Sequence, residues 1–370
     1  MKAARVLLIL AALLLLCTPA LGEEGVDAVV DALELDDFSA SVEQTGVDVR
    51  EMILSLAAGE ETWDINDLLA RGRDALLEEL SQAAAMVAGL LAPALLSAVA
   101  RQLSGEARSA QVVSQLAYLV CASQLAGWFV RLTAQAEELI AGVARLADGV
   151  FPVLASLLSL SGATASAAMV TPLSALAGNA FSRLLSQVGL KLCTVAAALA
   201  VAGQLSPRIR LERLFGLVRS AVNWATGVLM TGFLGLSAVR SLLSTGYDSA
   251  AVRTARYAVD NLLPVVGGEV ANTMDALVSS VLLVKNAAGV AGLFALLLLC
   301  ARPLMTLAAA LVALRLVSAL LEPVAEDTLI ALADKFSQVA GMLLVICVSA
   351  AVILTLLLGG TLTAGQSVVR

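Results

Sequence analysis

Three pairs of polar side chains lie inside or beside apolar stretches of the sequence: Arg145 with Asp148, Arg256 with Asp260, and Lys285 with Asn286. Charged groups within a bilayer are costly, and they usually face protein or water. The Arg-to-Asp spacings of three and four residues let each pair meet on one helical face. These residues either brace a bent helix or line a path for polar molecules, and the sequence leaves both readings open.

The residue types needed for most catalysis are missing. The chain has no histidine, which excludes an imidazole base and histidine metal ligands. Its five cysteines stand singly, without a C-x-x-C spacing, and we expect the four beyond Cys17 to be buried thiols. There is no P-loop and no basic, aromatic strip for nucleic acid. The sequence therefore predicts no catalytic, metal or cofactor site, and no enzyme.

The composition points to a membrane. Of 370 residues, 59% are hydrophobic and 14% are charged, against roughly 25% charged in globular proteins. The apolar runs approach the roughly 20 residues that cross a bilayer as a helix. We therefore predict an all-α, polytopic membrane protein in contact with the lipid bilayer.

The first 82 residues divide into two segments. Lys2 and Arg5 precede the apolar run 6–16 and small residues up to Gly22, which predicts a cleaved signal peptide over 1–22. Residues 23–82 carry 17 of the 30 acidic residues, so we expect an extracytoplasmic segment of short amphipathic helices. The acidity serves either solubility or a basic partner.

The membrane domain is expected over residues 83–360, followed by a tail over 361–370. Seven spans are predicted, at 83–100, 111–130, 188–205, 220–239, 284–300, 304–321 and 339–358. Residues 149–180 form an extra apolar stretch, expected as a broken or re-entrant hairpin. The candidate helix breaks and gate residues are Pro152, Gly162, Pro172, Pro264 and Gly267.

Loop charges predict the orientation. A cluster of arginines marks a cytoplasmic loop and a candidate docking site: Arg208, Arg210, Arg213 and Arg219. The acidic loop that contains Glu322 and Glu326 is easily translocated, so we expect it on the opposite side. Seven spans after a cleaved leader place the C-terminus inside.

Two segments resemble each other. Residues 144–154 and 255–266 share an Arg, an Asp and a Pro, with the prolines 112 residues apart. An internal repeat built on broken helices is how many transporters form a central path. Chance similarity is the alternative in a chain so rich in Ala, Leu and Val.

Residues 254–267, Thr-Ala-Arg-Tyr-Ala-Val-Asp-Asn-Leu-Leu-Pro-Val-Val-Gly, and the segment 282–292 resemble the stage III sporulation protein AE family. The similarity extends to 151–158, to the basic loop 208–213 and to the final spans, about residues 80 to 360.

The resemblance implies a multi-pass protein of endospore-forming bacteria, in the mother-cell-derived membrane around the forespore. It implies a secretion-like complex with other proteins of the stage III sporulation A operon, including an ATPase and ring-forming components. It also implies an indirect contact with a forespore membrane protein. A homo-oligomer is left open, and so is the cargo.

Three functions follow. The first is a channel or export-gate-like subunit of the complex that links mother cell and forespore, needed for forespore development. The second is a structural membrane scaffold without its own conduit. The third is an independent secondary transporter.

Overall fold

The structure is a computed structural model that describes residues 23–33, 35–42, 47–59, 65–104, 108–205, 211–262, 267–323 and 325–364. The predicted signal peptide lies outside these residues. The described part contains helices and no strand: α2 (Glu23–Asp31), α3 (Asp36–Val42), α4 (Val49–Ala58), α5 (Ile65–Ser104), α6 (Arg108–Leu160), α7 (Thr164–Ala175), η2 (Leu176–Phe181), α8 (Ser182–Leu184), η3 (Leu185–Leu190), α9 (Lys191–Leu205), α10 (Glu212–Leu262), α11 (Gly267–Leu321) and α12 (Asp327–Thr363).

Within the described chain, six helices are long and apolar enough to cross a membrane: Gly72–Leu103, Gln111–Leu160, Thr164–Gly203, Glu212–Val239, Leu277–Leu321 and Asp327–Thr363. In hydrocarbon a helix satisfies every backbone N–H and C=O within one segment, which favours this architecture. The prediction of an all-α, polytopic membrane protein is confirmed.

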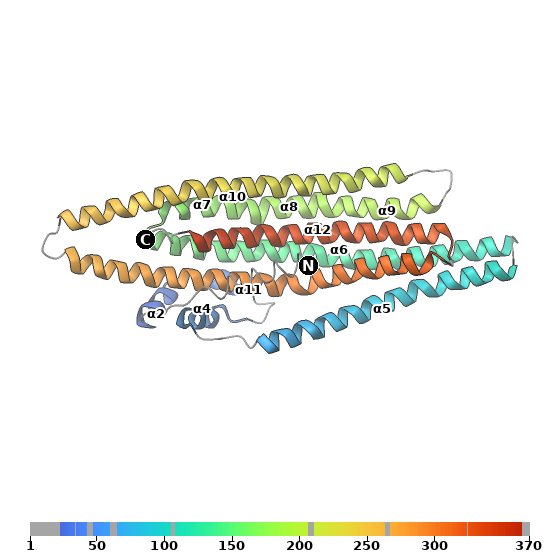
Figure 1. The fold of residues 1–370 in the computed structure, drawn as a ribbon, viewed down its shortest axis with the longest axis horizontal. Helices are drawn as coiled ribbons and strands as arrows, with labels where there is room; N and C mark the ends of the chain where they lie inside the picture. Colours follow the sequence, from blue (N-terminus) through green and yellow to red (C-terminus); the bar gives the residue numbers. More distant parts are fainter. Residues whose placement is uncertain are drawn as a thin grey trace.

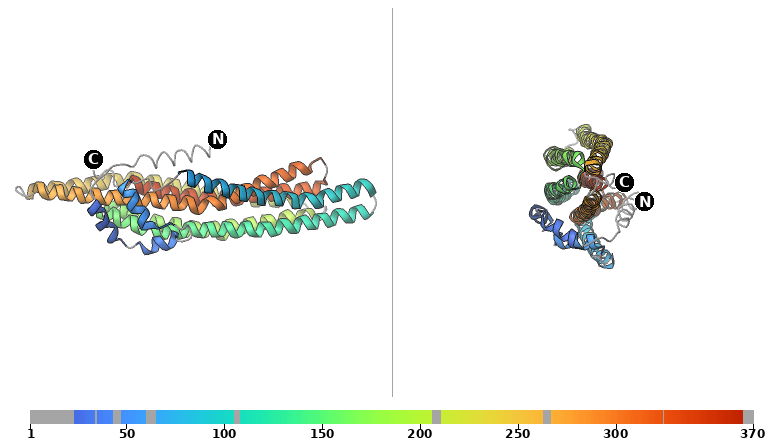
Figure 2. Two further views of the ribbon diagram at one scale, coloured as in Figure 1. Left: turned by 90° about the horizontal axis from the view of Figure 1, so that it is seen from below. Right: turned by 90° about the vertical axis from the view of Figure 1, so that its left-hand side faces the viewer.

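The long helices form one elongated antiparallel bundle (Figure 1). Seen end-on in Figure 2, α6 and the α7–α9 helix lie side by side against α12 and α11, with α10 beside α9. The "arginine end" is where α5, α9 and α11 finish; there Arg101 lies 3.9 Å from Glu326. The "acidic end" is where α6, α10 and α12 finish and where α2–α4 pack.

Two contacts fix the register of α6 against α12, which run parallel. The rings of Phe129 and Phe336 pack edge to face at 6.4 Å between centroids. Val150 and Leu358 both approach the Cα hydrogens of Gly292, where an added Cβ would lie 3.2 and 3.4 Å from their methyl groups. Residues 129–150 of α6 therefore lie beside 336–358 of α12.

Small residues allow α11 to sit at the centre of the bundle. Ala288, Ala291 and Ala295 are buried, and a Cβ at Gly289 would lie 2.5 Å from Cδ2 of Leu362. Dispersion contacts drive helix packing in lipid, so close approach is what stabilises such an interface.

The short helices α2–α4 cap the acidic end. Asp48 accepts backbone N–H bonds at the start of α4, and Gly59 ends it in the left-handed region at φ 73°. Phe38 and Ile53 are fully buried, so the amphipathic helices expected in this segment bury their apolar faces against α6 and α11. Helix α5 continues without interruption through residue 82, where the sequence placed a segment boundary.

The structure has one long helix where two spans were expected at 284–300 and 304–321. Both segments lie in α11, with Pro303 inside it. A proline removes one helical hydrogen bond, and packing with neighbouring helices compensates for that loss in membrane proteins. The chain therefore runs through the bundle once here, and the described residues contain six long apolar helices where seven spans were expected.

Because α11 runs through the bundle once and not twice, the segments that follow it lie at the end opposite to the one predicted. Arg219 donates a hydrogen bond from Nη1 to Oε1 of Gln338 at 2.7 Å, and the ammonium of Lys335 lies 6.0 Å from the ring of Phe215. Glu322 and Glu326 thus lie at the same end as Arg219, which the sequence had placed across the membrane from them. The end of α12 accordingly lies at the acidic end, and not with the arginines.

The predicted hairpin at 149–180 is the junction of two long helices. Helix α6 ends at Leu160, and Gly162 takes φ 85° while Ala163 donates its N–H to the carbonyl of Leu158 at 3.0 Å. Pro152 and Pro172 were expected to break helices, but both lie within continuous ones. Their exposed rings avoid crowding against the core.

Gly149 lies where α3 packs on α6, so a substitution there tests this contact. A Cβ at this position would lie 2.7 Å from the carbonyl oxygen of Asp37 and 3.0 Å from Cα of Phe38. Since backbone cannot yield easily, we expect Gly149→Ala to destabilise the protein by about 1–3 kcal/mol. Thermal unfolding in detergent and limited proteolysis of residues 23–59 measure the loss.

Gly127→Ala on the same helix is the matched control, since nothing lies within 4 Å of its added Cβ. Greater helix propensity should leave this variant at least as stable as the parent. Equal behaviour of the two variants would contradict the described docking of α3 on α6.

Candidate functional site

A cleft with a mixed apolar and polar lining opens between α5, α6 and α11 and has a volume of about 640 Å³. Three glutamines, two hydroxyl residues and one cation supply its polar lining: Gln82, Gln124, Gln135, Ser123, Thr306 and Arg131. The α6 part of the cleft, residues 123–135, lies beside 330–342 of α12 by the register above. The cleft therefore lies beside the part of α12 where the polar residues at its start are followed by its apolar residues.

An ion-pair cluster lies one helical turn beyond the cleft, toward the acidic end. Arg302 of α11 donates from Nη2 to Oε1 of Glu78 at 3.2 Å, and its Nε lies 3.6 Å from Oε1 of Glu79. The Glu79 side chain is 5% exposed, so its carboxylate is removed from solvent. Arg302 precedes Pro303, which places the cluster where α11 lacks one hydrogen bond.

The sequence did not single out this cluster. Glu78 and Glu79 belonged to the acidic segment, and Arg302 stood between two expected spans. A signal was present in the helical spacing, since Arg131 and Gln135 lie four residues apart and Glu78 and Gln82 do as well. What could not be read was that α5 and α11 bring opposite charges together.

Lys285 is fully buried between α11 and the end of α12. Its ammonium donates to the carbonyl oxygens of Leu362, at 3.1 Å, and of Ala364. A cation at a helix C-terminus meets unpaired carbonyls and the negative end of the helix dipole. Beside it, the Oδ1 atom of Asn286 is buried and accepts no hydrogen bond from the described residues.

The predicted Arg–Asp pairs are arranged differently. In the described part of the chain Asp148 pairs with Asn179, whose Nδ2 lies 3.5 Å away, and not with Arg145. Arg145 and Asp148 are both exposed on α6. For Arg256 and Asp260 the structure describes the helix, α10, but not the side chains. Pro264 lies outside the described residues, and Gly267 begins α11.

The predicted docking arginines are at the arginine end as far as they are described. Arg213 is exposed, and Arg219 belongs to a chain of hydrogen bonds through Gln338 to Asp334, the second at 2.9 Å. Arg208 and Arg210 lie outside the described residues.

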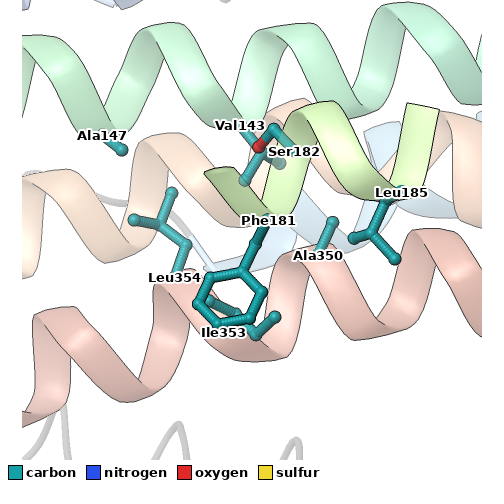
Figure 3. Close-up of a pocket in the computed structure, with 8 residues that line it drawn as sticks. All are labelled: Val143, Ala147, Phe181, Ser182, Leu185, Ala350, Ile353 and Leu354. Atoms are coloured by element: carbon teal, nitrogen blue, oxygen red, sulfur yellow. The ribbon is translucent and has the colours of Figure 1, made fainter. Parts of the chain in front are cut away.

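A small cavity lies between α6, α8 and α12. Figure 3 shows Phe181 and Leu185 pointing toward α12, where Ile353 and Ala350 lie, and Ser182 beside Val143 of α6. The cavity that they enclose with Val143 and other apolar side chains is about 10 Å³, roughly the space of a single water molecule. Across the described residues no three His, Cys, Asp or Glu side chains are grouped to hold a metal.

The family model for stage III sporulation protein AE matches residues 47–365, most of the chain. The chain belongs to the stage III sporulation protein AE family. It is also 27% identical over 203 residues to the stage III sporulation protein AE of Bacillus subtilis (strain 168). That match covers 55% of this chain and 51% of the relative, so the chain matches about half of the relative's length. No solved structure matches the chain. The family name denotes a sporulation protein and names no reaction.

Lys285→Met tests the role of the buried ammonium. Methionine fills a similar volume but leaves the carbonyls of Leu362 and Ala364 without this donor, so we expect a loss of about 1–3 kcal/mol in stability. Thermal unfolding in detergent measures it, together with faster carboxypeptidase digestion of the C-terminus. Arg315→Met, at an exposed position of the same helix, is the control. Equal stability of the two variants would contradict a stabilising role for Lys285.

Proposed function

We propose that this chain is a channel or export-gate-like subunit of the sporulation complex that links mother cell and forespore, and that forespore development needs it. The observation that carries the proposal is the cleft of α5, α6 and α11, whose lining includes six polar side chains within apolar helices. Amide and hydroxyl groups replace part of the hydration of a polar molecule, which lipid-facing side chains cannot do.

The arginine end faces the mother-cell cytoplasm in this proposal. The positive-inside tendency supports that orientation, since Arg101, Arg213 and Arg219 lie there and the acidic helices α2–α4 lie at the opposite end. The cleft then lies on the cytoplasmic side of the Arg302 cluster.

Arg302 with Glu78 and Glu79 acts as the gate. The Arg302 and Glu78 side chains are 63% and 55% exposed, whereas Glu79 is buried, so opening the contact would leave the Glu79 carboxylate buried without its cation. Energy from partners, such as the ATPase of the operon, would open the contact. The ring-forming components of the same complex would continue the path beyond the membrane.

A scaffold is the second candidate function, and the distribution of charge at the two ends favours it. Exposed carboxylates cover the helices α2–α4, with Asp31 paired to Arg50 and others such as Asp27, Asp36 and Glu51 facing solvent. Exposed arginines lie at the other end. Each end could bind a partner of opposite charge without any conduit.

Arg302→Gln distinguishes a gate from a scaffold. Removing the cation leaves the buried Glu79 carboxylate uncompensated, so we expect late forespore transcription to fall on the order of tenfold or more. The readout is a forespore reporter in a sporulating host that carries only the variant, with protein accumulation measured by immunoblot. Arg315→Gln, on the same helix, should behave as the parent.

Exchanging the charges, with Arg302→Glu and Glu78→Arg together, should restore most of the reporter signal. Normal sporulation with Arg302→Gln would contradict the gate and leave the scaffold. Transport by the purified protein alone, without partners, would instead favour an independent secondary transporter.

A further inference from the structure

Four side chains of α6 that line the cleft form a single stripe along the helix. The stripe consists of Gln124, Trp128, Arg131 and Gln135. Their spacings of four, three and four residues place them on one face of an α-helix. Trp128 is partly buried and the other three side chains are exposed. The cleft therefore receives an amide, an indole, a guanidinium and a second amide from one helix.

Arg131 has no counter-charge in the part of the chain that the structure describes. No ion pair among those residues includes it, and neither it nor Gln124, Gln135 or Gln82 forms a hydrogen bond there. The positions three and four residues from Arg131 on α6 carry no carboxylate. A guanidinium offers five N–H donors. Arg131 thus presents an uncompensated positive charge and free donors to the cleft.

The other polar groups of the lining add donors but no negative charge. Ser123 and Thr306 donate their hydroxyl hydrogens to helix carbonyls, at 2.9 Å to Val120 and 3.0 Å to Arg302, so toward the cleft they only accept. The glutamine amides and the indole N–H are donors, and no carboxylate lines the cleft. An acceptor-rich anion is the complement of this lining.

The carboxylates nearest to the cleft are directed to another helix. Glu78 lies one helical turn from Gln82, but Glu78 and Glu79 contact Arg302 of α11, at 3.2 and 3.6 Å, and neither lines the cleft. Two carboxylates share one guanidinium in that cluster, so it repels an anion. An anion is therefore held at Arg131 and does not advance past Gln82 while the cluster is closed.

The cleft has room for an organic molecule. Its volume of about 640 Å³ lies within the roughly 300–1,000 Å³ of small-molecule sites. A Cβ added at Gly127, on the wall of the cleft, would meet nothing within 4 Å. The indole of Trp128 and the side chain of Met86 give the cleft an apolar surface next to Arg131. The lining thus fits an acid group joined to an apolar body.

We infer that the cleft binds small organic anions, with a carboxylate or phosphate group at Arg131 and the apolar part against Trp128. A guanidinium binds such groups through two parallel N–H bonds, and the amides of Gln82 and Gln135 donate to the remaining oxygens. The inference rests on the proposed function for the role of the cleft as a path, and it adds the class of molecule. The phosphate of a lipid headgroup has the same chemistry, so the test includes both sources.

The fluorescence of Trp128 measures binding directly. The full chain with Trp63→Phe and Trp224→Phe retains Trp128 alone of its three tryptophans, and it is placed in phosphatidylcholine nanodiscs. Phenyl phosphate and hexanoate are titrated at constant ionic strength. We expect a saturable change in emission, and Arg131→Gln to weaken the affinity by about tenfold or more. Arg145→Gln, exposed on the same helix but outside the cleft, should keep the parent affinity.

Gly127→Leu is a second variant, which fills the cleft and keeps Arg131. The space in front of Gly127 lets the new side chain enter without a clash, so we expect unchanged thermal stability and loss of binding. Nanodiscs of phosphatidylglycerol form the lipid arm. If only this lipid changes the emission of Trp128, and Arg131→Gln abolishes the change, the anion at Arg131 is a lipid headgroup.

The inference is overturned if neither soluble probe nor phosphatidylglycerol changes the emission of Trp128. It is also overturned if the change is the same in Arg131→Gln and Gly127→Leu as in the parent. The gate can fail separately: binding at Arg131 together with normal sporulation of Arg302→Gln would contradict the gate alone. Loss of sporulation in Arg302→Gln without any binding would overturn the anion site alone.

Discussion

The packing of α6 against α12 and α11 holds charged side chains of α6 at the depth of the most apolar helix in the chain. Gly292 makes this possible, because its missing side chain lets Val150 and Leu358 meet at the surface of α11. Once that register is fixed, α6 cannot slide its polar residues toward water. The free-energy cost of these charged side chains in hydrocarbon is lowered only if they face a water-filled cleft, an ion-pair partner or another protein surface.

The same register leaves the hairpin of α5 and α6 staggered relative to the other helices. The contact between Cys121 and the carbonyl of Leu90 lies near the arginine end, where both helices expose leucine and valine side chains. Farther along, α5 carries Glu78 and Glu79 and α6 carries Arg131 and Glu138. Polar and apolar parts thus alternate along the bundle, as expected for a subunit whose surroundings are partly protein.

Sequence reasoning reached the helical membrane architecture because long apolar runs have few other solutions in a bilayer. It also located the turn near Gly162, since a glycine in the left-handed region depends on local residue type. It failed at Pro303, where local chemistry suggested a break and tertiary packing kept α11 continuous. The cluster of Arg302, Glu78 and Glu79 joins residues more than two hundred positions apart, and no local pattern encodes that contact.

The continuity of α11 decides the topology, since one crossing more or fewer changes the side of everything that follows. Single cysteines at Glu51, Arg213 and Glu322, in a chain whose native cysteines are serine, can be labelled from outside intact cells with an impermeant maleimide. We expect labelling at Glu51 in intact cells, and at Arg213 and Glu322 only after the membrane is opened. Labelling of Glu322 but not Arg213 in intact cells would place a further crossing between them and contradict the six-helix arrangement.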